Sequence, residues 1–137
     1  MKRRTAREKA VQCLFQIDMA EVKLRDAIDL VMEDSEEDAG YMVSLVEGTL
    51  RFLNQIDDEI RKYLRGWQLE RIANVDRAVL RLAFYELMFE QNEVPEKVVL
   101  NEAVELAKVF SDEQSYRFVN GVLSSYLAER KQEKSEA

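Results

Sequence analysis

The stretch NEAVELAKVFSDEQSYRFVNGVL, residues 101–123, has the pattern of two helices joined by a short connection. Apolar residues recur at i, i+3, i+4 and i+7 on each side of Ser111, which is the spacing of one helix face. They are Ala103, Leu106, Ala107 and Phe110 before it, and Val119, Val122, Leu123 and Tyr126 after it. Ser111 and Gln114 have the spacing of a capping box, so we expect the second helix to begin there.

The dipeptide Asn120-Gly121 disagrees with this pattern, because Asn-Gly is the strongest short signal for a β-hairpin. Its flanks have helical rather than alternating periodicity, so we place it inside the second helix. A glycine there costs about 1 kcal/mol of helix propensity. We therefore expect Gly121 to serve close packing or access to a ligand, next to the cation Arg117 and the aromatic Phe118.

Outward from this stretch, the same periodicity predicts an all-α protein of about seven helices. The other helices are expected over residues 5–19, 24–32, 37–53, 55–64 and 75–91, and from Pro95 onward. The helix at 75–91 is apolar on nearly all faces, which predicts a buried central helix. One Pro, four Gly and 47% hydrophobic residues favour a single helical domain over residues 1–137, with a frayed, charged tail from about residue 129.

Several kinds of chemistry are excluded by composition. The chain has no histidine, and Cys13 is its single cysteine, which excludes Cys–His zinc sites, Ser–His–Asp triads and an intrachain disulfide. Its four glycines are too scattered for a phosphate-binding loop, and the adjacent Asp57 and Asp58 are expected to be solvated. We therefore expect a binding protein rather than an enzyme, without metal or cofactor, and Cys13 as a buried, unreactive residue.

The compartment follows from similar arguments. A single cysteine is typical of a reducing environment. The charged start lacks the apolar segment of a secretory signal, and the most apolar region, residues 79–89, is too short and too charged to span a membrane. We expect a cytoplasmic protein without a membrane partner.

Charge is distributed unevenly along the chain. The net charge is −7, yet residues 1–9 carry a local charge of +4, which leaves −11 on the rest. A basic end on an acidic body is typical of contact with nucleic acid or an acidic partner, although a solvated, disordered start explains the charge equally well. Arginines at a helix start oppose the macrodipole, which suggests an anionic partner.

Proteins that bind single-stranded RNA combine cations for phosphates with aromatic rings for bases. The candidates are Arg3, Arg4, Arg7, Tyr63, Arg117 and Phe118, although Phe118 taken alone fits a core position better than a stacking role, because Val122 one turn on is apolar.

Four segments, in order and over nearly the whole chain, resemble the NusB family of bacterial transcription antitermination factors. They are RRTAREKAVQCLF (3–15), NVDRAVLRLAFYEL (74–87), VPEKVVLNEAVELAKVF (94–110) and YRFVNGVL (116–123). Residues 19–38 show no such correspondence. The resemblance implies two small helical bundles packed together around the central helix.

The resemblance also implies a function. Members of this family bind the boxA element of nascent RNA together with NusE, a small-subunit ribosomal protein. The heterodimer joins RNA polymerase in antitermination complexes, notably on ribosomal RNA operons. Family members are not enzymes, and some form homodimers, a point that the resemblance leaves open for this chain.

Carried onto this sequence, the family pattern implies RNA contact by Arg3, Arg4, Arg7, Gln114, Arg117 and Phe118. The NusE surface maps to Phe15, Asp76, Arg77 and Arg81. Gln114 stands where an acidic residue is common, and the loss of that charge should favour RNA. Phe15 replaces a common tyrosine, so any contact through that hydroxyl is absent.

Two alternatives stand beside this hypothesis. One is the RNA-recognition domain of a NusB-related ribosomal RNA methyltransferase, which would need a much longer chain than 137 residues. The other is a helical adaptor whose acidic body binds a basic protein. The leading hypothesis makes a geometric prediction: the start of the first helix and the last helix should meet and form one RNA surface.

Overall fold

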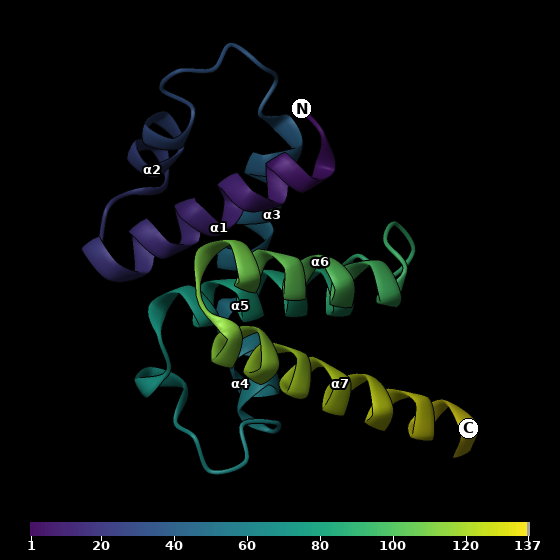
Figure 1. The fold of residues 1–137 in the computed structure, drawn as a ribbon. Helices are drawn as coiled ribbons and strands as arrows, with labels where there is room; N and C mark the ends of the chain where they lie inside the picture. The colour runs from purple at the N-terminus through teal and green to yellow at the C-terminus, as the bar shows by residue number, and fades with distance from the viewer. Residues whose placement is uncertain (137) are drawn as a thin grey trace.

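The computed structural model describes residues 1–136, which form seven α-helices and one short 3-10 turn, with no strand among them (Figure 1). The helices are α1 (Arg3–Ala20), α2 (Leu24–Val31), α3 (Gly40–Arg51), α4 (Leu53–Arg61), α5 (Asn74–Phe89), α6 (Glu96–Phe110) and α7 (Glu113–Glu136), with the turn η1 at Leu69–Arg71. The all-α prediction is confirmed. No helix of the described part is long and apolar enough to cross a membrane.

Helix α5 is the centre of the molecule, as its all-round apolar sequence predicts. It packs against α1 and α3 on one side and against α4, α6 and α7 on the other. Nearly every residue from Ala78 to Leu87 is buried, and the Phe84 side chain is fully enclosed. Helices α1, α2 and α3 form one small bundle, and α6 and α7 pack antiparallel in the other (Figure 1).

Both helix starts predicted from capping boxes are shifted. Helix α1 begins at Arg3 instead of Thr5, and its N-cap residue Lys2 makes no side-chain cap. At the junction after α6, the cap of α7 is Asp112, whose carboxylate accepts the backbone N–H of Ser115 at 2.9 Å. A carboxylate satisfies a free N–H and also complements the helix dipole, so Asp112 is favoured over Ser111.

The C-terminal segment is drawn as helix to Glu136, and the frayed tail from residue 129 stays a prediction. The antiparallel packing of α6 and α7 brings this segment back to the first residue of α6. There Arg130 and Lys134 approach the Glu96 carboxylate at 3.7 and 3.4 Å. Arg130 also lies over the Tyr126 ring, 5.6 Å from its centre. The two contacts with Glu96 join residues 34 and 38 positions apart, which helical periodicity cannot reveal.

Gly48 marks the closest helix crossing. A Cβ atom added there would lie 2.3 Å from the Tyr85 ring, so α3 and α5 can approach only because residue 48 has no side chain.

Cys13 is buried as expected, and burial raises the pKa of its thiol to about 11. A protonated, enclosed thiol is unreactive at neutral pH.

Candidate nucleic-acid interface

The start of α1 presents two arginine side chains to solvent. Arg3 lies over the Tyr41 ring, 4.9 Å from its centre. Arg4 donates two hydrogen bonds to the Glu102 carboxylate on α6, at 2.9 and 3.0 Å, yet its side chain stays 61% exposed. The first turn of α1 contains no acidic residue. Two cations at an uncapped helix start are unfavourable without an anion, and a phosphate would supply one.

Arg7 lies elsewhere than expected. Its guanidinium donates hydrogen bonds of 3.0 to 3.1 Å to both carboxylate oxygens of Glu86 on α5. The two side chains are only 4% and 2% exposed. We therefore remove Arg7 from the candidate RNA contacts, because a phosphate cannot reach a guanidinium enclosed by α1 and α5. The same arginine triplet thus contains two surface cations and one core ion pair.

The first turns of α7 provide a second group of candidates. Gln114 and Arg117 are exposed, and Arg117 pairs with Glu113 one turn earlier. Phe118 is partly buried against the core, and its ring contacts the Trp67 indole at 6.4 Å with 68° between the planes. Phe118 therefore combines the two roles considered from sequence: part of its ring packs on the core, and part remains at the surface.

Tyr63 and Gly121 lie next to this group. A surface pocket of about 180 Å³ is lined by Tyr63, Arg65, Trp67, Arg117, Phe118 and Gly121, among others. The Tyr63 ring is buried in edge contact with Tyr126, so it forms the floor of the pocket and not a free stacking surface. A Cβ atom at Gly121 would meet nothing within 4 Å. Close packing therefore does not explain the glycine at position 121. Of the two explanations considered from the sequence, access of a ligand to the backbone is the one left.

Trp67 is a functional candidate that the sequence analysis did not include. Its neighbours Leu69 and Ile72, in the connection after α4, are buried in the core. The Trp67 side chain is instead 64% exposed. The signal for this was its position directly after Gly66, whose backbone φ of +94° reverses the chain direction at that point.

Asp76 is a buried carboxylate with incomplete hydrogen bonding. It accepts a hydrogen bond from Ser115 at 3.2 Å, but its other oxygen finds no donor among residues 1–136. Burial raises the pKa of Asp76, and the nearby charge of Asp112 adds to this, against the opposing effect of the Ser115 bond. A pocket of about 330 Å³ opens beside it, lined also by Arg71 and Gln114.

The remaining residues mapped to the NusE surface lie along the α1–α5 contact. Phe15 packs partly buried against the core. Arg77 donates to Asp18 at 2.7 Å, and Arg81 donates to Asp57 at 2.8 Å. Both arginines are mostly enclosed, so their present contacts are internal. Asp57 is buried in this cluster, which corrects the expectation that it is solvated.

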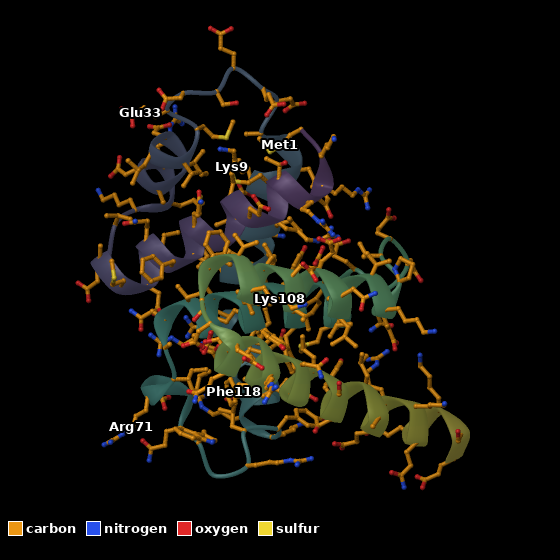
Figure 2. All side chains as sticks on the ribbon, viewed as in Figure 1. Met1, Lys9, Glu33, Arg71, Lys108 and Phe118 are labelled. Atoms are coloured by element: carbon orange, nitrogen blue, oxygen red, sulfur yellow. The ribbon has the colours of Figure 1, made fainter. Side chains whose placement is uncertain are left out.

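The predicted meeting of the two cationic regions is wrong. Helix α7 packs against α6 and α5, whereas the first turn of α1 reaches α6 through the Arg4–Glu102 pair. Helix α6 separates the two regions (Figure 1). In the side-chain view, Met1 lies above α6 and Phe118 below it, with Lys108 of α6 between them (Figure 2). The chain therefore has two candidate regions and no single joint surface.

Comparison with known proteins gives these regions a context. The family model described as the NusB family matches residues 4–128, which includes Arg4, the candidates on α7 and the segment 19–38. The chain belongs to the NusB family. Its NusB relatives include the transcription antitermination protein of Bacillus subtilis, which is 48% identical over 132 residues, 96% of this chain and 99% of that protein. The corresponding protein of Listeria monocytogenes is 47% identical over 131 residues.

Solved NusB structures agree with the fold. T. maritima NusB superimposes with a TM-score of 0.81 at 35% identity, covering 91% of this chain and 89% of that one. A chain from the crystal structure of the antitermination factors NusB and NusE in complex with double-stranded RNA gives a TM-score of 0.80 at 32% identity, covering 90% and 93%. The two-bundle architecture is thus that of NusB, and this NusB-family chain is a transcription antitermination protein.

Proposed function

We propose that this protein binds the boxA element of nascent RNA together with NusE, and so promotes processive transcription, notably of ribosomal RNA operons. It acts in the cytoplasm as part of an RNA polymerase antitermination complex and catalyses no reaction. The observation that carries the proposal is the pairing of exposed cations with exposed aromatic surface in a chain of net charge −7. A solved NusB relative is in complex with NusE and RNA, which supports both partners.

The RNA contacts divide by chemistry. Arg3, Arg4 and Arg117 hold phosphates, because their side chains are exposed and their guanidinium groups can bind an anion. Phe118 stacks on an unpaired base through the part of its ring that the core leaves free. Gln114 lies one turn before it and offers an amide that both donates and accepts hydrogen bonds.

The NusE contact centres on Asp76. Its free carboxylate oxygen is buried without a donor, which costs stability that a cation or amide from a partner would restore. Phe15 supplies apolar surface along α1. Arg77 joins α5 to α1 through Asp18, and Arg81 joins α5 to α4 through Asp57, so their role is to position this face.

The test is a binding titration with boxA RNA and a scrambled RNA of the same composition, each with and without NusE. We expect boxA to bind more tightly than the scrambled RNA, and NusE to increase the difference. Equal binding of the two RNAs would overturn the proposal. Tight binding of NusE with no effect on RNA would identify the protein as an adaptor between proteins.

A further inference from the structure

We infer that Trp67, together with Arg65 and the exposed side of α7 at Arg117 and Gly121, forms a second nucleotide site. Its ligand is an unpaired nucleotide of single-stranded RNA, with the base stacked on the Trp67 indole and a phosphate held by Arg65 and Arg117. This inference rests on the proposed RNA binding and adds a nucleotide beyond the one stacked on Phe118.

The first observation is the exposure of Trp67. Its indole is 64% exposed, although it is the only tryptophan of the chain and one of its most apolar side chains. The edge contact with Phe118 holds the two rings at 68° and fixes the orientation of the indole. A fixed, solvent-facing aromatic plane is what base stacking requires.

The second observation is the backbone conformation of the turn that precedes Trp67. Arg65 and Gly66 have backbone φ angles of 49° and 94°, both in the left-handed region. An arginine there is strained, and strain of this kind is concentrated at binding and catalytic sites. The Arg65 guanidinium donates to the Ser125 hydroxyl at 3.1 Å, which holds the cation beside α7. It forms no ion pair within residues 1–136.

The third observation is the charge and shape of the pocket. Its lining contains two arginines, Arg65 and Arg117, and no carboxylate. Arg117 pairs with Glu113, but both side chains are largely exposed and can exchange this contact for a phosphate. At Gly121 the absence of a side chain leaves open space, so a ligand can approach the α7 backbone directly.

These features favour a nucleotide over an apolar peptide. An apolar peptide would be favoured by a lining without charge, whereas here the aromatic lining of Tyr63, Trp67 and Phe118 is flanked by two arginines on an otherwise acidic protein. Arginine beside an aromatic ring adds cation–π attraction to base stacking. The pocket next to Asp76 lies on the other side of Trp67 and contains two carboxylates, so it repels phosphate.

Trp67 provides its own test, because it is the only tryptophan of the chain and its fluorescence responds to a base stacked on the indole. The full chain is titrated with labelled single-stranded boxA RNA, with and without NusE, while anisotropy of the RNA and fluorescence of Trp67 are both recorded. We expect base stacking to quench Trp67 with the same midpoint as the anisotropy change. Because the indole also contacts Phe118, the titration is repeated with Phe118→Ala, in which quenching by a base on Trp67 should persist.

Three variants sharpen the result. Trp67→Ala should weaken RNA binding about 5- to 150-fold, and Trp67→Phe should restore most of the affinity. Arg65→Gln should reduce the slope of log K against log salt by about 0.7, the value for one phosphate contact on a single strand. Arg25→Gln, which removes an exposed arginine on α2, is the matched control and should change the slope less.

An anisotropy change with neither Trp67 quenching nor any loss in Trp67→Ala would overturn this inference and leave the proposed function intact. A Trp67 fluorescence change with NusE alone, unaltered by RNA, would overturn it by showing that the pocket contacts protein. No anisotropy change under any condition would overturn both the inference and the proposed function.

Discussion

Arg7 and Glu86 form the most buried ion pair of the molecule, and removing one partner leaves the other charged and unpaired in the core. We expect Arg7→Met to lower the free energy of unfolding by about 3–5 kcal/mol, measured by urea denaturation. Arg4→Met is the matched control, because Arg4 is largely exposed, and it should cost much less. Equal losses in the two variants would contradict this description of Arg7.

Asp76 makes stability depend on pH. Its pKa in the folded state is raised, mainly by burial, so the folded protein binds this proton more tightly than the unfolded chain does. Stability is therefore lost as pH rises from the ordinary pKa of an aspartate through the raised one. Asp76→Asn removes the charge, so we expect it to raise the melting temperature at pH 7, with the advantage shrinking as pH is lowered.

The same substitution separates stability from function. Because the free Asp76 oxygen is assigned to NusE, Asp76→Asn should weaken NusE binding while it stabilises the fold. Asp58→Asn is the control, since Asp58 is 76% exposed and lies on α4 away from this pocket. An Asp76→Asn protein that binds NusE normally would count against the assigned contact.

At the scale of helices, Gly48 and Gly121 form a matched pair with opposite predictions. Alanine has a higher helix propensity than glycine by about 1 kcal/mol. At Gly121 the added methyl group meets nothing, so Gly121→Ala should stabilise the protein by up to about 1 kcal/mol and yet weaken RNA binding. At Gly48 it would overlap the Tyr85 ring, so Gly48→Ala should destabilise the protein.

Thermal unfolding of the two variants checks the first part of this prediction, and RNA titration of Gly121→Ala checks the second. Stabilisation without any loss of RNA affinity would show that RNA does not approach this part of α7. It would leave the Gly48 prediction untouched, because that depends only on the contact between α3 and α5.

At the scale of the whole molecule, the two proposed RNA-contact regions lie on either side of α6, and this separation should make binding losses additive. Arg3→Gln with Arg4→Gln should reduce the salt slope by about 0.7 for each lost phosphate contact. Phe118→Ala should cost about 1–3 kcal/mol of binding free energy if it stacks on a base. Combined, the losses should add within about 0.5 kcal/mol, because the sites share no partner. A triple variant no weaker than Phe118→Ala would show that RNA does not contact the first turn of α1.

Much of the fold could be predicted from the local pattern of apolar and polar residues. Seven helices, the central position of α5 and the break at Pro95 follow from periodicity and from residues that favour or end helices. Helix ends were less accurate, as at Asp112, where two adjacent residues can both serve as caps. For the candidate site, the sequence predicted only which types of residue would take part, namely arginines for phosphate and a phenylalanine for a base.

By itself, the sequence determined which segments are helical, which helix is central and which residues carry charge, because these depend on neighbours within a few positions. Tertiary structure alone decided that Arg7 is enclosed by Glu86 while Arg4 stays at the surface, and that Trp67 is exposed beside Phe118. It also decided that α6 separates the two cationic regions. Such outcomes depend on which distant segments pack together, and neither periodicity nor local charge contains that information.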